Sequence, residues 1–235
     1  HLIVCIKPHN IPSQEDESLD KDMLTMVKEY IKENAAYVAS MLAIFGETSE
    51  SYSYWTFGDI FEERGVPFAP FHGGFGMVAN RCIPKPTFYA FKFFKDLTGE
   101  CVLKNDYCVV CKENGIYKGV VFNSRVKRTG EALDLKLTID AEADKYSLIK
   151  KVVDEDTCNP LKLWHVMGEP ASLNEEQIKL LKDSDKPLTE SVIINSADGK
   201  VEVCMNVKEF GLVYFELKPY VLTSDRGYDY DRVVG

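Results

Sequence analysis

The 235-residue sequence contains no apolar run that approaches the roughly 20 residues needed to span a lipid bilayer. Its first residues also lack the basic segment, hydrophobic stretch and small-residue cleavage site of a secretory signal. Basic residues are outnumbered, since 28 Lys and Arg stand against 37 Asp and Glu, for a formal net charge of −9. Because nucleic-acid affinity depends on clustered Lys and Arg, we expect a neutral or small polar ligand and neither a membrane nor a nucleic acid.

Patterns that hold metals and cofactors are missing as well. The four histidines are widely separated in the sequence: His1, His9, His72 and His165. Cys108 and Cys111 have the spacing of a zinc or redox pair, but they lie in an apolar run typical of a strand, where residues three apart face opposite sides. The seven cysteines are odd in number and scattered, which favours a reducing compartment. We predict no metal, no cofactor and a cytoplasmic location.

The first part of the chain alternates between strand, helix and loop patterns. Leu2–Ile6 is apolar and β-branched, as in a buried strand, and apolar residues from Met23 to Phe45 recur at helical spacing. Ser51–Phe57 fits an aromatic strand, and the Gly- and acid-rich residues 58–76 predict a long loop. A helix should then begin at Pro86 and end before Gly99, with a stripe formed by Phe88, Phe91, Phe94 and Leu97.

Beyond Gly99 the periodicity changes to that of strands. Two hairpins are predicted, one around Asn114-Gly115 and one around Asp198-Gly199. Further strands are expected at residues 132–139, 146–153 and 211–217. Ser172 with Glu175 forms a capping-box pattern, which predicts a short helical insertion near residues 172–183. We therefore predict an α/β unit over residues 1–99 and an antiparallel β-sandwich over residues 100–235.

The long loop and the strand before it carry the residue types of a sugar site. Trp55 supplies a ring on which a pyranose face stacks, and Asp59, Glu62 and Glu63 supply acceptors for its hydroxyl groups. A structural interpretation is also open, in which Trp55 is a core aromatic residue and the acidic residues are solvated. Composition alone favours this second interpretation.

Three blocks of sequence shift that balance toward a sugar site. Ser53–Glu63 contains Tyr-Trp-Thr-Phe-Gly-Asp-Ile-Phe-Glu-Glu, Phe71–Gly76 reads Phe-His-Gly-Gly-Phe-Gly, and Ile83–Pro86 reads Ile-Pro-Lys-Pro. In this order and spacing the blocks resemble the carboxy-terminal part of family 39 glycoside hydrolases of the β-xylosidase type. Gly58 departs from that pattern, which has Ser at this position. The segment from Asn34 to Ala39 resembles the family as well.

The resemblance implies a fold and a site. Residues 1–99 would be the last strands and helices of a (β/α)₈ barrel, and the β-sandwich would follow. Trp55 would stack on the bound sugar, Glu63 would accept hydrogen bonds from its hydroxyls, and Phe71 and His72 would line or brace the same region. Asp59 and Glu62 would have structural roles. The implied ligand is xylose or a xylo-oligosaccharide.

The same resemblance implies that the catalytic carboxylates lie elsewhere. Retaining glycosidases need two carboxyl groups about 5 Å apart. The acid/base residue belongs to an upstream strand, and Leu2–Ile6 is not followed by the glutamate that should act as nucleophile. An alignment anchored on Ala35 places Glu17 near the nucleophile position, but the neighbours of Glu17 do not match. With Glu17 as the one candidate, the chain alone is predicted to be inactive.

Two further readings of the chain stay open. Because the sequence opens with His1, we expect a preceding barrel portion as partner, and an incomplete barrel would expose apolar edges that favour a homo-oligomer. Alternatively, the chain is a non-catalytic accessory, oligomerisation or carbohydrate-binding module. For a sugar platform on the sandwich itself, the candidate residues are tyrosines near the end of the chain: Tyr214, Tyr220, Tyr228 and Tyr230.

Overall fold

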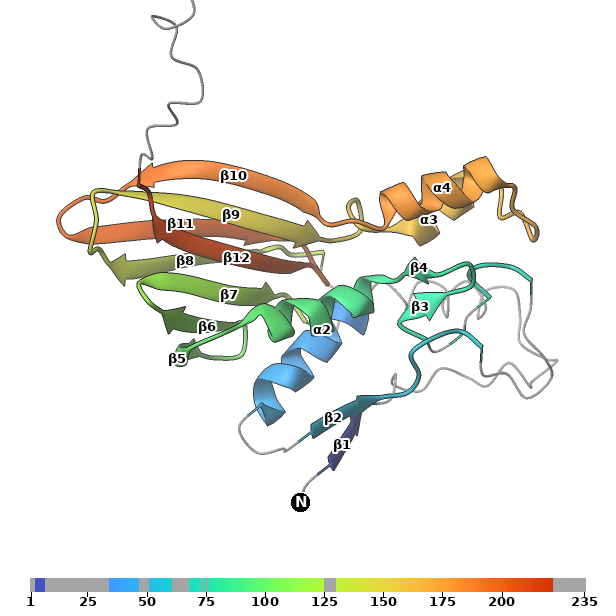
Figure 1. The fold of residues 1–235 in the computed structure, drawn as a ribbon, viewed down its shortest axis with the longest axis horizontal. Coiled ribbons are helices and arrows are strands. Elements are labelled where there is room, and N and C mark those ends of the chain that lie inside the picture. Colours follow the sequence, from blue (N-terminus) through green and yellow to red (C-terminus); the bar gives the residue numbers. More distant parts are fainter. Residues whose placement is uncertain are drawn as a thin grey trace, which may run out of the picture.

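The largest sheet among the described residues has six antiparallel strands (Figure 1). The structure is a computed structural model that describes residues 3–6, 34–46, 51–60, 68–72, 74, 76–124 and 130–221. Along the sheet the strand order is β10-β9-β12-β7-β6-β5. The strands span β5 (Glu100–Lys104), β6 (Cys108–Glu113), β7 (Ile116–Phe122), β9 (Lys145–Val153), β10 (Leu188–Asn195) and β12 (Leu212–Pro219).

A second, two-stranded antiparallel sheet pairs β8 (Leu133–Asp140) with β11 (Lys200–Val207). β11 alternates strictly between exposed and buried side chains, as a strand with one solvated face should. Its buried side chains share a core with strands of the large sheet, so the two sheets face each other. The strands predicted at residues 132–139, 146–153 and 211–217 are present, whereas β5, whose sequence Glu-Cys-Val-Leu-Lys does not alternate, was not predicted.

The turn between β6 and β7 follows directly from its sequence. Asn114 and Gly115 have φ values of 51° and 76°, the left-handed conformation that a two-residue hairpin turn requires at both central positions. The first predicted hairpin is confirmed, with Glu113 opposite Ile116.

The second predicted hairpin is wrong in its strand pairing. Asp198 and Gly199 do form a tight turn, with φ values of 51° and 71° and paired backbone groups of Ala197 and Lys200. The strands on either side of the turn nevertheless do not pair with each other, since β10 pairs with β9 and β11 pairs with β8. The turn thus carries the chain from one sheet to the other, because long-range pairing and not turn chemistry decides which strand is the neighbour.

Four helical segments are described, at residues 34–45, in α2 (Pro86–Asp96), α3 (Pro160–Val166) and α4 (Glu175–Ser184). α2 begins with Pro86 as predicted. For α4 the predicted cap is wrong by two residues. Asn174 and Gln177 form the reciprocal capping box, because the Asn174 side chain accepts from the Gln177 N–H at 2.8 Å. α3 was missed, although Asn159-Pro160 supplies a cap and a first helical residue.

Helix α2 and helix 34–45 pack on one face of the large sheet and share a core with it (Figure 1). The Phe93 ring, 1% exposed, stacks on Tyr214 of β12 with ring centroids 5.4 Å apart. The predicted stripe of Phe88, Phe91, Phe94 and Leu97 is only half-buried. The prediction that this stripe is the buried face of the helix is therefore wrong. The most buried face of α2 carries Tyr89, Ala90 and Phe93, because α2 packs on helix 34–45 and β2 as well as on the sheet.

The two faces of β6 belong to different cores, as predicted for residues three apart in a strand. Cys111 packs in the core shared with the helices, and Cys108 packs in the core between the two sheets. At the beginning of the chain, β1 (Ile3–Ile6) pairs in parallel with β2 (Ser51–Tyr54). Two short antiparallel segments, β3 (Val78–Ala79) and β4 (Ile83–Pro84), lead into α2.

We expect Phe93→Ala to lower the free energy of unfolding by about 3–5 kcal/mol, because it leaves a cavity between α2 and β12. Lys95→Ala, on the exposed side of the same helix, serves as the matched control and should change stability by less than about 0.5 kcal/mol. Urea unfolding followed by circular dichroism measures both. Equal stability of the two variants would contradict a core shared by α2 and the sheet.

Candidate functional site

Trp55 lies directly after β2, where the parallel strands β1 and β2 both reach their carboxyl ends. Its side chain is 47% exposed, which is unusual for a tryptophan that only packs in a core. The Trp55-Thr56 peptide bond is cis. Beneath it, the Asn34 amide donates to the Tyr54 hydroxyl at 2.7 Å and lies 3.3 Å from the Thr87 hydroxyl. Helix 34–45, β2 and α2 are thereby joined under the strand end.

A buried ion pair holds the loop that follows Trp55. The Lys85 ammonium lies 2.7 Å from Asp59 Oδ2 and 2.9 Å from Asp59 Oδ1, and both residues are 2% exposed. Lys85 also donates to the Gly74 carbonyl at 2.8 Å, and the Gly76 N–H donates to Asp59 at 2.7 Å. The two backbone groups supply further hydrogen bonds to Asp59 Oδ1 and to the Lys85 ammonium, which offsets part of the cost of burying the charges.

The ion pair gathers the three sequence blocks in one place. Asp59 comes from the first block, the glycines from the second and Lys85 from the third. Backbone bonds support the assembly, since Met77 N–H donates to Thr56 O at 3.1 Å and Val78 N–H to Phe57 O at 2.9 Å. Asp59 has the structural role expected of it. The part played by Lys85 was not predicted, although the Ile-Pro-Lys-Pro block was the signal that pointed to it.

Two glycines allow the backbone to approach Asp59 closely. A Cβ atom on Gly76 would lie 2.4 Å from the Gly58 carbonyl carbon, and one on Gly74 would lie 2.6 Å from Asp59 Cγ. Gly58 differs, because a Cβ atom there would meet nothing nearer than the Val78 carbonyl oxygen at 3.8 Å. The Cβ atom of a serine, the residue that the resembled sequence pattern has at this position, would therefore have room at position 58.

The other residues predicted for the site have different surroundings. Phe71 is 1% exposed and packs on Trp164 with ring centroids 5.7 Å apart, so it braces the loop from inside. His72, next in the chain, is half-buried. Glu63 and Glu17 lie outside the described residues. Of the residues predicted to contact or brace a sugar, the structure thus describes an exposed Trp55, a buried Phe71 and a half-buried His72.

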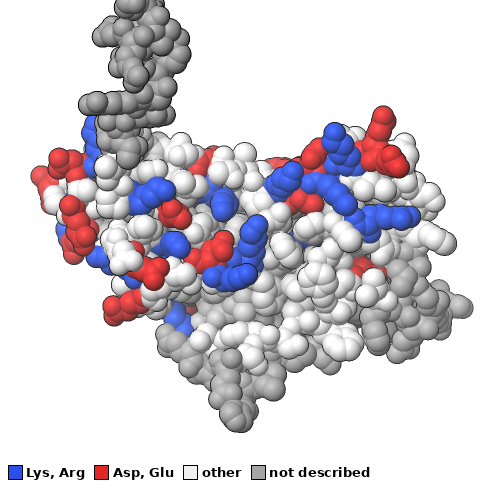
Figure 2. Space-filling model, in the orientation of Figure 1, with Lys and Arg blue, Asp and Glu red and all other residues white. Residues whose placement is uncertain are grey.

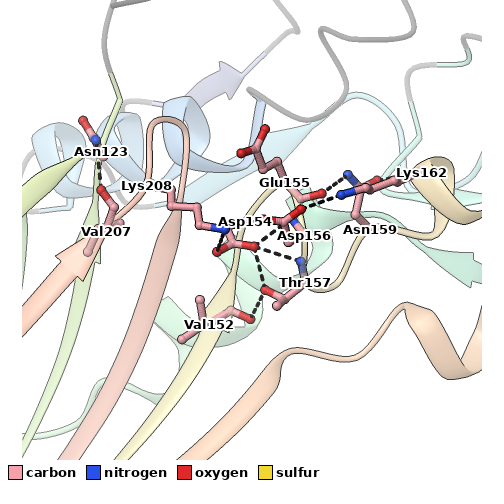
Figure 3. Close-up of polar contacts among 10 residues, drawn as sticks. All are labelled: Asn123, Val152, Asp154, Glu155, Asp156, Thr157, Asn159, Lys162, Val207 and Lys208. Carbon is pink, nitrogen blue, oxygen red and sulfur yellow. Dashed lines mark hydrogen bonds and ion pairs between the residues drawn. The ribbon is translucent and has the colours of Figure 1, made fainter. Parts of the chain in front are cut away.

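A second polar cluster follows β9, and its carboxylates have fixed partners (Figure 3). Asp154 accepts from the backbone N–H and the hydroxyl of Thr157 at 2.8 and 3.0 Å. Asp156 pairs with Lys162 at 2.5 Å and with Lys208. These two lysines hold the pKa of Asp156 down at about 2. Because Lys208 follows β11, the cluster ties the small sheet to the loop before α3 and has a structural role.

A cavity of about 660 Å³ lies between that loop, α3, α4 and the start of β10. Cys158 and Asp185 belong to the same region, where the Cys158 thiol donates to the Asp185 carbonyl at 2.8 Å. Burial raises the pKa of Asp185 to about 6 and pushes the pKa of the Cys158 thiol far above its usual value. Cys158 is therefore a packed thiol rather than a nucleophile. The cavity lining does not include Trp55, Phe71 or His72.

The aromatic residues proposed for a sugar platform on the sandwich do not form one among the described residues. Tyr214 is 3% exposed and stacks on Phe93, while Tyr220 is 36% exposed. Tyr228 and Tyr230 lie outside the described residues. On the face shown in Figure 2, both signs of charge are interspersed over the strands and over α3 and α4. Within the described part of the chain, no helix has both the length and the apolar character that crossing a membrane requires.

The exposed Trp55 ring at this parallel strand end offers an aromatic face to a ligand. The model of the family "Glycosyl hydrolases family 39" matches residues 9–202. The chain belongs to this family.

Its sequence is 34% identical over 188 residues to a β-xylosidase of Geobacillus stearothermophilus, covering 79% of this chain and 37% of that protein. It is 35% identical over 143 residues to a β-xylosidase of Caldicellulosiruptor saccharolyticus, covering 57% and 29%. The chain therefore spans about a third of the length of these curated relatives.

Solved structures agree with this membership. The fold is similar to that of a family 39 enzyme from Xanthomonas axonopodis pv. citri, with a TM-score of 0.71, 25% identity and coverage of 80% of this chain and 41% of that chain. It is also similar to a monomeric β-xylosidase from Caulobacter crescentus CB15, with a TM-score of 0.69, 25% identity and coverage of 81% and 42%. The family predicted from the three sequence blocks is confirmed.

We expect Asp59→Asn and Lys85→Met each to lower the free energy of unfolding by about 3–5 kcal/mol, because each leaves an unpaired buried charge. The double variant Asp59→Asn/Lys85→Met leaves no charge and should cost clearly less than the sum of the two single changes. Denaturant unfolding of the unmodified chain, the two single variants and the double variant gives the coupling free energy of the pair. Strictly additive losses would contradict a coupled ion pair.

Gly76→Ala should lower stability by about 1–3 kcal/mol or more, because its methyl group overlaps the backbone at Gly58 and Asp59. Gly58→Ser in the same loop is the control and should stay within about 0.5 kcal/mol of the unmodified chain. Thermal or urea unfolding compares them. A Gly76→Ala protein as stable as Gly58→Ser would show that the loop does not approach Asp59 this closely.

Proposed function

We propose that the chain is the carboxy-terminal part of a retaining β-xylosidase, which hydrolyses terminal β-xylosides of xylo-oligosaccharides. In this proposal residues 1–99 are the end of a (β/α)₈ barrel, and residues 100–235 are a β-sandwich with a helical insertion. The parallel pair β1 and β2, with helix 34–45 between them in sequence, supports the barrel assignment. The two antiparallel sheets that share a core support the sandwich assignment.

The observation that carries the proposal is the half-exposed Trp55 ring at the carboxyl end of β2. Active sites of (β/α)₈ barrels lie at this end of the strands. The Trp55 ring would stack on the apolar face of the xylose unit, and Glu63 and His72 would bind its hydroxyl groups. Phe71 would brace this loop from the core side. The buried Asp59–Lys85 pair would keep the ring and the loop in one arrangement without touching the sugar.

The catalytic acid/base residue and the nucleophile would come from the remaining part of the barrel. The match to about a third of the length of the curated relatives supports this division. So do large apolar side chains that are exposed around the strand end, as expected of a surface that packs against further barrel elements. They are Phe57, Ile60 and Phe68, which are 65–83% exposed. Six cysteines among the described residues are free thiols, which supports a reducing, cytoplasmic compartment.

Titration with xylobiose followed by tryptophan fluorescence tests the role of Trp55. The chain has two tryptophans, and the other, Trp164, is 3% exposed. We expect xylobiose to change the emission of the unmodified chain. Trp55→Ala should abolish the change and weaken binding about tenfold, because it removes an apolar contact worth on the order of 1.5 kcal/mol.

Trp164→Phe is the matched control, since it removes the buried fluorophore and should leave the xylobiose-dependent signal in place. Calorimetric titration of the same variants gives the affinity without relying on fluorescence. Binding that persists in Trp55→Ala would refute the proposed sugar contact.

A further inference from the structure

Strands β5 and β6 bring two cysteines side by side. Cys101 of β5 is paired directly with Cys111 of β6, and both are free thiols. Residues that stand opposite each other in an antiparallel pair have Cα atoms about 4.5–5.5 Å apart, and their side chains leave the sheet on the same face. A disulfide requires a Cα separation of about 4.4–6.8 Å. The strand pairing therefore already holds these two cysteines at a separation that a disulfide spans.

The register that creates this pair is held by a close approach of the backbone. Gly99, just before β5, has a φ of 90°, and a Cβ atom there would lie 2.2 Å from the Lys112 carbonyl oxygen. Only glycine tolerates this conformation and this contact. The start of β5 is thereby held against the end of β6, which places Cys101, two residues after Gly99, opposite Cys111.

The two thiols differ in their access to solvent. Cys101 is exposed, and its thiol donates to the Leu103 carbonyl at 3.6 Å. Cys111 is 8% exposed, and burial, followed by the neighbouring Cys101 thiol, raises its pKa. An exposed thiol is the one that a reagent in solution reaches first, whereas a buried thiol beside it reacts with its neighbour. The pair therefore consists of an attacking cysteine, Cys101, and a resolving cysteine, Cys111.

We propose that Cys101 and Cys111 are a modification site, at which a low-molecular-weight disulfide such as oxidised glutathione converts the two thiols into a reversible intramolecular disulfide. First the Cys101 thiolate attacks one sulfur of the reagent, so that a mixed disulfide forms, the S–S bond of the reagent breaks and one small thiol leaves. Cys111 then gives its proton to water and attacks Cys101 Sγ, which displaces the second small thiol. Two cysteine sulfurs are oxidised, and the reagent is reduced to two thiols.

The disulfide stabilises the junction between α2 and the large sheet. β5 is an edge strand that follows α2 almost directly, and all five of its residues are exposed (Figure 1). The new bond closes the loop of residues 101–111 and holds β5 on β6, which lowers the entropy of the unfolded chain. The site lies apart from the carboxyl end of β2, so the proposal does not rest on the proposed function.

Mass analysis of the full chain after equilibration with oxidised glutathione under native conditions tests the proposal. Trypsin cuts after Lys104 and Lys112, so the peptide with Cys101 is separate from peptide 105–112, which contains Cys111. We expect the unmodified chain to lose the two thiol hydrogens and to yield these two peptides linked. The midpoint of thermal unfolding should rise by about 5–10 °C and return on reduction, because a short loop is closed and reopened.

Three variants and one further cysteine distinguish this pair from general thiol oxidation. Cys111→Ala should stop at a glutathione adduct on Cys101, and Cys101→Ser should give neither the adduct at this position nor the link. Cys108→Ala is the matched control, since Cys108 lies in the same strand and peptide but packs in the other core, so the link should persist. Cys204 is exposed but stands opposite Lys136, so it should stay a mixed disulfide.

Several results would contradict the site. They are a glutathione adduct that stays on Cys101 of the unmodified chain, a link that survives Cys111→Ala, a link that is lost in Cys108→Ala, and a link that joins two chains. A linked chain with an unchanged midpoint of unfolding would overturn the stabilising role of the bond.

Discussion

The arrangement around Trp55 depends on the contact between the Lys85 ammonium and the Asp59 carboxylate. Both groups are almost fully buried, and burial of either alone would be strongly unfavourable. The pair therefore persists only while the chain segments that carry it stay in place, with the Gly74 carbonyl and the Gly76 N–H as further partners. The need to keep these two buried charges paired thus determines how the loop is placed at the strand end.

The position of Lys85 is in turn set by α2 and the large sheet. Lys85 is the residue before Pro86, at the N-cap of α2, and so it has the place that the start of this helix gives it. The helix is fixed on the sheet by its buried face, where Phe93 stacks on Tyr214 of β12. Asn34 links helix 34–45 to α2 and to β2. The place of Lys85 in the ion pair thus follows from the packing of α2 on the sheet.

Signals that act over a few residues were predictable from the sequence. Pro86 at the start of α2, the Asn114-Gly115 turn and the alternation in β8 and β11 are of this kind. Interactions between distant residues were not. Asp198-Gly199 has the same turn chemistry as Asn114-Gly115, yet the strands beside it join different sheets. Likewise, nothing local to Lys85 indicates its partner, because Asp59 lies 26 positions earlier and the contact exists only when the loop is folded.

The contact between α2 and β12 also bears on whether the sandwich acts as a separate carbohydrate-binding module. An independent module should be able to stand apart from its neighbours and should carry a solvent-facing aromatic platform. The sandwich has a core between its two sheets, but the other face of the large sheet contributes Tyr214 and residues of β6, β7 and β9 to a second core that it shares with helix 34–45 and α2. Tyr214, the leading candidate for the platform, is a buried member of that core. The sheet is therefore better understood as the support on which the helices of the strand-end site are held, and a sugar contact is favoured at Trp55 over one on the sheet.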